Sequence, residues 1–483
     1  MRRLSEMTGL AQRIDPEIAG ITADSRRVAP GWLFAALPGT RADGRAFIDQ
    51  ALAQGAVAVL APEGTVIEAE GVAVVTDPNP RRRFAQLAAA FHGLQPETMV
   101  AVTGTNGKTS VANFFRQICH RLGHPSAAIG TLGIIAEGWE NRGGLTTPDP
   151  AELHAALADL ARAGVTHACM EASSHGLAQF RLDGVRLAAA AFTNLTRDHL
   201  DYHGSMEAYL EAKLRLFSEV LPQGATVVVN ADADGADRVM AVATARGLHT
   251  IVFGTGGADL RLLATRSDAV GQVLELSIFG RRETIRLPLA GGFQAANALA
   301  ALGLAVAAGM DAVTAAEALE TLEGVPGRLQ QVAATAAGAA VYVDYAHTPD
   351  ALETVLAALR PHAAGRLVVV FGCGGDRDPG KRPQMGAIAA RLADLAVVTD
   401  DNPRGEDPAA IRAAVLAAAP GAVEIGDRAA AIRFGVSELR KGDILVVAGK
   451  GHEIGQIVGS TVTAFDDSEE ARRAVTEIEG GRP

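Results

Sequence analysis

The sequence predicts an α/β protein of three domains that is built mainly around parallel sheets. With 483 residues the chain is too long for one hydrophobic core, and its length favours about three domains. From about residue 97 onward, apolar strand-like runs alternate with helical segments, which is typical of a largely parallel sheet covered on both faces. Pro96 and the Gly- and Pro-rich segment 324–328 interrupt this pattern. We therefore predict domains at residues 1–95, 96–326 and 327–483.

Composition and charge narrow the class of protein. Hydrophobic residues make up 48% and charged residues 20% of the chain, as in ordinary soluble proteins. The 44 Lys and Arg against 55 Asp and Glu give a net charge of −11, which argues against a nucleic-acid-binding surface. The cysteines at 119, 169 and 373 form no C-x-x-C pair and have no metal-binding spacing, which favours a reduced cytoplasmic compartment. We expect a cytoplasmic monomer without nucleic-acid partners.

One charge-free segment, residues 287–310, is long enough to span a bilayer. However, it contains Pro288, a Gly291-Gly292 pair and the amides of Gln294 and Asn297. We therefore predict a buried helix that is entered through a turn, and no membrane span. The N-terminus has no apolar run of the signal-peptide kind.

The N-terminal 95 residues resemble a small α/β unit. Strand-like runs at 56–60 and 72–75 are separated by polar turns. Two clusters of small polar residues with arginine, at 22–26 and 39–44, are typical of surface loops when taken alone.

The segment 100–110 carries the most specific pattern. An apolar strand-like run at 99–102 breaks into a turn with Gly104 and Gly107, and a helix is predicted at 111–122. Glycines let backbone N–H groups face an anion, and the N-terminus of a helix attracts one. Lys108 can reach a nucleotide phosphate, and the Thr109 hydroxyl can bind Mg²⁺. The spacing departs from the strict G-x-x-x-x-G-K-[ST] pattern, and a Gly-rich turn with a surface lysine is the alternative. We predict a nucleotide-binding loop.

Two more apolar runs of the central region end in polar clusters, 171–175 and 193–199. Ligands of open parallel sheets bind at the carboxyl ends of strands, so these clusters and the loop predict one shared crevice. Glu171 and His199 are candidate Mg²⁺ ligands there. A hydrogen-bonded core histidine is the alternative for His199, but its charged neighbours argue against it. Lys213 lies in a helical pattern, and periodicity alone predicts a solvated side chain.

The C-terminal region repeats this pattern four times. Apolar runs at 340–343, 367–371, 395–398 and 444–447 each end in a polar cluster. Arg377 and Arg404 suit carboxylates, and Glu453 suits an ammonium. This combination predicts a pocket for an amino acid with more than one carboxylate. Salt bridges between domains are the alternative.

Together these motifs resemble the Mur ligases, ATP-dependent amide-forming enzymes of peptidoglycan precursor synthesis. The resemblance spans all three regions in order and rests on Thr103–Thr109, Glu171–His175, Asp198–His203, Asp344–Pro349 and Gly449–Glu453. Thr146–Asp149 and Asp401–Arg404 are similar to the members that add diaminopimelate. Arg404 suits the second carboxylate of that amino acid, whereas lysine-adding relatives lack an arginine there.

The resemblance implies a UDP-substrate-binding N-terminal domain, a central ATP-binding domain and a Rossmann-like C-terminal domain. It implies that UDP is held by Ala23, Ser25, Thr40, Arg41 and Ala42, and the muramoyl-dipeptide by Thr146, Thr147, Ser173, Gln179 and Arg181. For ATP it implies Gly104, Thr105, Asn106, Gly107, Lys108, Thr109, Ser110, Asn297, Arg328 and Asp344. For diaminopimelate it implies Arg377, Asp401, Asn402, Pro403, Arg404, Gly449 and Glu453. In this family the lysine at the place of Lys213 is carbamylated (N6-carboxylysine), and its carboxylate positions Mg²⁺.

The implied reaction joins meso-2,6-diaminopimelate to the D-Glu γ-carboxylate of UDP-N-acetylmuramoyl-L-Ala-D-Glu through an acyl phosphate. Its expected catalytic group is Lys108, Glu171, His199 and Lys213, with ATP and Mg²⁺ as cofactors. A lysine-adding Mur ligase and a folylpolyglutamate synthetase-like ligase are the alternative enzymes, and a nucleotide switch protein is the non-enzymatic one. The N-terminal segment and the Asp-Asn-Pro-Arg stretch argue against the synthetase. A switch protein does not need two further carboxylate-binding crevices.

Overall fold

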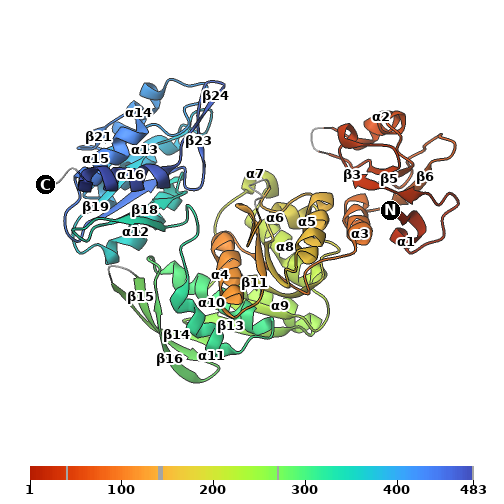
Figure 1. Cartoon of the computed structure of the whole chain (residues 1–483), viewed down its shortest axis with the longest axis horizontal. Coiled ribbons are helices and arrows are strands. Elements are labelled where there is room, and N and C mark those ends of the chain that lie inside the picture. Colours follow the sequence, from red (N-terminus) through yellow and green to blue (C-terminus); the bar gives the residue numbers. More distant parts are fainter. Residues whose placement is uncertain (40–41, 140–144, 269–270, 481–483) are drawn as a thin grey trace. The chain divides into compact units, whose positions relative to one another are not determined.

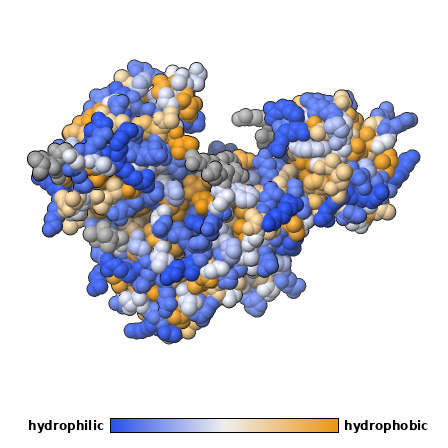
Figure 2. Space-filling view, in the orientation of Figure 1, coloured by the Kyte–Doolittle hydropathy of each residue, from blue (hydrophilic) through white to orange (hydrophobic). Residues whose placement is uncertain are grey.

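The computed structural model describes residues 1–39, 42–139, 145–268 and 271–480. It forms two compact units, one of Met1–Arg261 with Leu299–Ala315 and the other of Leu262–Ala298 with Ala316–Pro483 (Figure 1). Hydrophilic and hydrophobic residues are interspersed on the face that Figure 2 shows.

The first unit begins with a four-stranded parallel sheet of order β3-β4-β5-β6. Its strands are β3 (Gly20–Thr22), β4 (Trp32–Ala35), β5 (Ala58–Pro62) and β6 (Ala73–Asp77). Helices α1 (Leu4–Thr8) and α3 (Pro80–His92) contribute to the core on one face, and α2 (Ile48–Ala53) to the core on the other. The two predicted strands are confirmed as β5 and β6, while β3 and β4 were not predicted.

A second, larger sheet of this unit carries the glycine-rich loop. Neighbouring parallel strands follow the order β13-β12-β11-β7-β10-β8, and β9 (Gly133–Ala136) pairs antiparallel with β8. Their bounds are β7 (Thr98–Thr103), β8 (Ser126–Gly130), β10 (His167–Glu171), β11 (Leu187–Phe192), β12 (Thr226–Asn230) and β13 (His249–Gly254). Glu171 pairs with Val102, and Phe192 pairs with Thr103. The three predicted strand ends therefore lie side by side.

Helices link these strands, as predicted. They are α4 (Lys108–Arg121), α5 (Pro150–Arg162), α6 (Ser174–Ala178), α7 (Leu200–His203), α8 (Met206–Arg215) and α9 (Ala236–Arg246). The predicted helix at 111–122 thus begins earlier, directly after Gly107.

The second part of this region departs from the parallel pattern. β14 (Leu260–Asp268) pairs with β13 at its first residues, and β15 (Gly271–Ile278) and β16 (Arg281–Leu287) form an antiparallel pair. The charge-free segment forms α10 (Phe293–Ala307), followed by α11 (Ala312–Glu317). None of the helices in the described ranges combines the length and hydropathy that a bilayer-spanning segment needs.

The C-terminal sheet lies entirely in the second unit, with strand order β17-β18-β22-β19-β20-β21. Its strands are β17 (Gln330–Ala334), β18 (Ala340–Asp344), β19 (Leu367–Phe371), β20 (Leu395–Val398), β21 (Val423–Glu424) and β22 (Ile444–Ala448). All neighbours are parallel except the edge strand β17.

Helices cover both faces of this sheet (Figure 1). One core includes α12 (Pro349–Leu359), α13 (Lys381–Leu392) and α14 (Pro408–Leu416), and the other includes α15 (Arg428–Ser437) and α16 (Asp467–Gly480). A separate hairpin of β23 (Gly455–Val458) and β24 (Thr461–Ala464) follows β22. The four predicted strand ends of this region occur on adjacent strands.

Candidate active site

The glycine-rich loop joins the end of β7 to the start of α4. Gly104 has φ +147°, and a Cβ there would lie 2.0 Å from Thr193 Oγ1. Gly107 has φ +87° and is the residue before the helix. Thr193 Oγ1 donates to Asn106 O at 2.7 Å, so the neighbouring strand end braces the loop. Both glycines are required by this geometry, which presents the N-terminus of α4 to an anion.

Two lysines converge on one carbonyl of this loop. Lys108 Nζ donates to Gly104 O at 3.0 Å and to Thr105 O at 2.8 Å. Lys213 Nζ, from α8, donates to the same Gly104 O at 2.8 Å. The Lys213 side chain is 1% exposed, with its Nζ 4.2 Å from the centre of the Tyr209 ring. Burial, and then the charge of Lys108, lowers the pKa of Lys213 well below its ordinary value.

The prediction of a solvated Lys213 from helical periodicity is therefore wrong. Tyr209, Leu210 and Leu214 are buried with Lys213 on α8, and the glycine-rich loop supplies the acceptor for its side-chain amine. Periodicity alone could not reveal that a loop far away in the sequence covers this face.

Glu171 ends β10 and is buried. Its carboxylate accepts from Thr131 N at 2.8 Å and from Thr131 Oγ1 at 3.2 Å. Glu171 and Thr109 line the same narrow cavity. The Glu171 carboxylate and the Thr109 hydroxyl, both predicted metal ligands, thus line one cavity between the end of β10 and the start of α4.

His199 lies at the start of α7, with half of its side chain exposed. It has φ +52°, and its Nε2 is 3.4 Å from Asp198 Oδ2. Its ring centre is 4.8 Å from that of His175. The described residues contain no cluster of three or more His, Cys, Asp or Glu side chains fit to hold a metal. Glu171 and His199 therefore do not form such a cluster by themselves.

An aromatic group of His175, His199, Tyr202, His203 and Tyr209 surrounds this position. Burial lowers the pKa of His175 and that of His203. His203 Nε2 lies 3.0 Å from Ser174 Oγ. We had no expectation for this grouping from sequence, although the histidines belong to the motifs at 171–175 and 198–203.

The five residues predicted to hold a muramoyl-dipeptide form one connected network. Thr147 Oγ1 lies 2.9 Å from Ser173 Oγ, and Arg181 donates to Thr147 O at 2.7 Å and to Gln179 Oε1 at 2.7 Å. Thr146 Oγ1 lies 3.1 Å from Thr131 Oγ1, the hydroxyl that also contacts Glu171. The structure brings this group to the same strand ends as the glycine-rich loop.

The residues predicted to hold UDP lie in the N-terminal sheet. Ala23 and Ser25 follow β3, and Ala42 follows β4, so they lie at the carboxyl ends of adjacent parallel strands. Ser25 Oγ donates to Gln50 Oε1 at 3.1 Å. Thr40 and Arg41 lie outside the described residues.

Asp344, predicted to contact the nucleotide, is a buried carboxylate at the end of β18. It accepts from Leu329 N and Ala346 N, each at 2.7 Å. Burial raises the pKa of Asp344 to about 6. Arg328 stacks near Tyr345, 5.0 Å from the ring centre, and Asn297 Nδ2 donates to Gln294 Oε1 at 2.9 Å.

This raised pKa predicts a pH-dependent stability. Between the ordinary pKa of 3.8 and about 6, the folded protein binds a proton that the unfolded chain does not bind. The stabilising contribution is therefore present below this range and lost as the pH rises through about 6. The free energy of unfolding of the native protein should fall by about 1–2 kcal/mol from pH 5 to pH 7.5 relative to Asp344→Asn. Denaturant titrations at both pH values would measure this, and equal changes in both proteins would contradict it.

The residues predicted to hold diaminopimelate gather at the carboxyl ends of β19, β20 and β22. Asn402 Nδ2 donates to Glu453 Oε2 at 2.9 Å, and a Cβ on Gly449 would lie 2.6 Å from Asp401 Oδ2. Arg404 Nη1 donates to Gly375 O at 3.0 Å. Arg404 has φ +50° and is held by the β23–β24 hairpin, since Arg404 N donates to Ile457 O and Gly459 N to Arg404 O.

Tyr345 lies among these charges, and we did not single it out from the sequence. Burial raises the pKa of Tyr345, and the next largest effects on that pKa come from Glu453, Arg328, Asp401 and Arg377. These side chains therefore share one electrostatic environment. Its sequence signal was its position between Asp344 and His347 in the Asp344–Pro349 motif.

A buried ion pair links the backbone at the end of β20 to the backbone at the end of β22, the two strand ends that form this site. Arg428 and Asp467, both fully buried, pair through two 2.7 Å hydrogen bonds. Arg428 also donates to Ala448 O at 3.1 Å and to Asp400 O at 3.3 Å, directly before Gly449 and Asp401. The pair fixes the spacing of the β20 and β22 strand ends.

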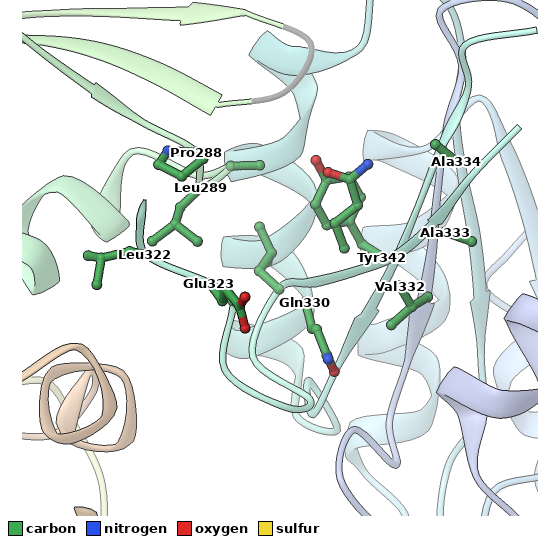
Figure 3. A pocket seen from close by; sticks show the side chains of 13 residues that line it. Pro288, Leu289, Leu322, Glu323, Gln330, Val332, Ala333, Ala334 and Tyr342 are labelled. Atoms are coloured by element: carbon green, nitrogen blue, oxygen red, sulfur yellow. The ribbon is translucent and has the colours of Figure 1, made fainter. Parts of the chain in front are cut away.

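A cavity of about 490 Å³ lies elsewhere in the second unit (Figure 3). Its walls are residues 288–290, 322–324, 329–334 and Tyr342, and Figure 3 shows Tyr342 and Gln330 between the two sides. Among the described residues, none of the predicted site residues lines this cavity. It adjoins the predicted nucleotide-binding residues, since the N–H of Leu329 in its wall donates to Asp344 Oδ2.

Comparison with known proteins gives consistent matches along the whole chain. The Mur ligase family catalytic domain matches residues 17–92, the Mur ligase middle domain residues 102–305, and the Mur ligase glutamate ligase domain residues 327–451. Two UDP-N-acetylmuramoyl-L-alanyl-D-glutamate–2,6-diaminopimelate ligases, from Caulobacter vibrioides and Agrobacterium fabrum, are each 56% identical to the chain. The first alignment covers 99% of both chains, and the second covers 96% of this chain and 95% of its relative.

A solved structure of a ligase with the same description is also similar. It has a TM-score of 0.74 and 36% identity, and the alignment covers 96% of this chain and 95% of that one. A folylpolyglutamate synthase from Mycobacterium tuberculosis complexed with ADP shares the fold at 19% identity, with a TM-score of 0.62 over 83% of this chain and 94% of that one. The predicted α/β class with N-terminal, middle and C-terminal domains is thus confirmed. The three family matches, and the 56% identity to two relatives over nearly the full length, show that the chain belongs to the Mur ligase family.

Proposed function

We propose that the protein is an ATP-dependent ligase that adds meso-2,6-diaminopimelate to the D-Glu γ-carboxylate of UDP-N-acetylmuramoyl-L-Ala-D-Glu, in peptidoglycan precursor synthesis. The observation that carries this proposal is the gathering of Asp401, Asn402, Arg404, Gly449 and Glu453 at one sheet edge. The guanidinium of Arg404 suits a carboxylate, and the carboxylate of Glu453 suits an ammonium. Together they suit an amino acid with two charged ends. The descriptions of the most similar relatives agree with it.

ATP is the nucleotide that we assign to the glycine-rich loop. The open backbone at Gly104 and Gly107 and the ammonium of Lys108 support a triphosphate there. We assign Asn297 and Arg328 to its adenine and phosphates, and Asp344 to its ribose. A MurF ligase from Thermotoga maritima, solved in complex with ADP, shares the fold at 19% identity with a TM-score of 0.62.

Mg²⁺ fits the same strand ends. Thr109 and Glu171 offer the oxygen donors that Mg²⁺ prefers, and we assign His199 as a third ligand. When bound, Mg²⁺ neutralises charge on the phosphate oxygens. Carbamylation of Lys213 would add a further carboxylate at a place where the described residues lack a three-ligand cluster.

The reaction proceeds in two steps in this proposal. An oxygen of the D-Glu γ-carboxylate bonds to the γ-phosphorus of ATP, and the bond to the β–γ bridging oxygen breaks to release ADP. The uncharged amine of diaminopimelate then attacks the acyl carbon, inorganic phosphate leaves, and the amine gives up a proton. Lys108 holds the transferring phosphoryl group, and Thr146, Thr147, Ser173, Gln179 and Arg181 hold the acid substrate. Because His199 is assigned to Mg²⁺, His347 is the histidine that remains to accept the amine proton; its Nδ1 lies 2.8 Å from Tyr345 O, which leaves Nε2 for that proton.

The buried environment of Lys213 supports its carbamylation. A lowered pKa leaves a neutral amine, which attacks CO₂ to give a carbamate and release a proton. We predict a carbamate signal in the ¹³C NMR spectrum of protein equilibrated with ¹³C-bicarbonate, and its loss in Lys213→Met. Lys441→Met, which changes an exposed lysine, should keep the signal. A spectrum without any carbamate signal in the native protein would contradict the assignment.

We also propose the domain boundaries 1–95, 96–326 and 327–483, and a monomeric cytoplasmic enzyme. The family matches at 17–92, 102–305 and 327–451 support these boundaries. Cys119, Cys169 and Cys373 are buried free thiols, which supports a reducing compartment.

Phosphate release is the assay that tests this function. It should require both ATP and UDP-N-acetylmuramoyl-L-Ala-D-Glu, and diaminopimelate should support it far better than lysine. Equal or better use of lysine would identify a lysine-adding ligase. Release that depends on a folate and glutamate would identify the synthetase-like alternative, and hydrolysis without any acceptor would favour a switch protein.

A further inference from the structure

Lys450 is a fully buried lysine beside the proposed amino-acid site. It lies two residues after β22 and is 0% exposed. Its Nζ lies 3.1 Å from Asn402 Oδ1 and 3.2 Å from Glu453 Oε2. A buried ammonium is costly unless it is paired and hydrogen-bonded, so these two partners hold it in place. Both partners belong to the residues that we assign to diaminopimelate.

The contacts of Asn402 determine which way its amide faces. The Lys450 ammonium and the backbone N–H of Ile457, 2.9 Å away, can only donate hydrogen bonds. The atom that they both approach must therefore be the amide oxygen. The amide nitrogen then donates one hydrogen to Glu453 Oε2 and carries a second one.

The carboxylate of Glu453 is oriented by the same network. Its Oε2 accepts from both Asn402 and Lys450, and the side chain is 35% exposed. The other oxygen, Oε1, is the one left to receive an ammonium from solution. An N–H donor and a carboxylate oxygen side by side match the carboxylate and ammonium of one end of an amino acid.

We propose that Lys450 is a positioning residue for the incoming amino acid, because it fixes the Asn402 amide and the Glu453 carboxylate in the orientations that bind one amino-acid end. Its ammonium is engaged by Asn402 Oδ1 and Glu453 Oε2, so it acts on the substrate through these two side chains. This inference rests on the proposed function and assigns a further residue to that site.

Steady-state kinetics of Lys450→Met test the inference. We expect the KM for diaminopimelate to rise about 10- to 100-fold, which is the size of one lost charge-assisted hydrogen bond. The kcat and the KM values for ATP and the UDP-linked substrate should stay within about twofold. Lys450→Arg, which keeps the charge, should recover part of the loss, and Lys441→Met should behave as the native protein. An unchanged KM for diaminopimelate would overturn the proposal.

A double-mutant cycle tests whether Lys450 acts through Glu453. In a Glu453→Gln background, adding Lys450→Met should raise the KM for diaminopimelate by less than about threefold. Fully additive effects would show that Lys450 does not act through Glu453 and would overturn the proposal.

Trapping of the acyl phosphate with hydroxylamine separates positioning from a general loss of structure. This partial reaction does not use the amino-acid site, so Lys450→Met should form the hydroxamate at the native rate. A parallel loss of hydroxamate formation would assign Lys450 a merely structural role. If the native protein formed no hydroxamate, the proposed function would fail, whereas calorimetric titration of diaminopimelate into native protein and Lys450→Met would still decide the role of Lys450.

Discussion

Lys108→Ala should reduce ADP formation by about 10³-fold or more. The Lys108 ammonium lies directly over the glycine-rich loop, within 3.0 Å of two of its carbonyls, where a γ-phosphate is placed by our proposal. Removing this ammonium leaves the negative charge of the transferring phosphoryl group without its nearest cation. The loss should therefore fall mainly on kcat, as measured by a coupled ADP assay at saturating substrates.

Two controls separate this effect from misfolding. Lys441→Ala removes an exposed lysine and should leave ADP formation unchanged. The thermal unfolding curve of Lys108→Ala should also stay close to that of the native protein. Undiminished turnover in a folded Lys108→Ala protein would remove the loop from the mechanism.

Arg404→Ala should raise the KM for diaminopimelate by about 30- to 1,000-fold and relax the rejection of lysine. Loss of one charge-assisted pair with a carboxylate costs about 2–4 kcal/mol, which corresponds to this range. Lysine has no second carboxylate, so its use should change little. The ratio of kcat/KM for the two amino acids, measured by phosphate release, reports this change in selectivity.

Arg433→Ala is a matched control, because Arg433 is an exposed arginine of the same domain in a surface ion pair with Glu477. It should leave the ratio unchanged, since surface ion pairs contribute little. If Arg404→Ala used both amino acids at native rates, Arg404 would not select the substrate.

Sequence reasoning succeeded where the signals were local. The turn at Gly104 and Gly107 follows from backbone sterics, and the order of strand and helix placed it correctly. The shared crevices also followed, because parallel strands place their carboxyl ends at one sheet edge. The Glu171 end of β10 and the Thr103 end of β7 are neighbours for this reason.

Features that depend on tertiary contact were missed. The burial of Lys213 depends on a loop more than 100 residues earlier, and helical periodicity carries no information about it. The antiparallel β15–β16 hairpin had a readable signal, since Leu274, Leu276 and Ile278 alternate before a turn at Phe279 and Gly280 that has positive φ at both residues. We expected a mostly parallel sheet for residues 96–326, and this expectation did not include an antiparallel hairpin.

Lys108 and Lys213 both donate to Gly104 O, so a ligand that changes the charge of one lysine also affects the other. Burial and the charge of Lys108 both disfavour a charged Lys213, and conversion of its neutral amine to a carbamate places an anion beside the Lys108 ammonium. Dissolved carbon dioxide and a polyphosphate would then be heterotropic ligands of one loop, each changing the affinity of the other by the same factor. Carbamylation of Lys213 and occupancy of the loop by its nucleotide would in this way be coupled.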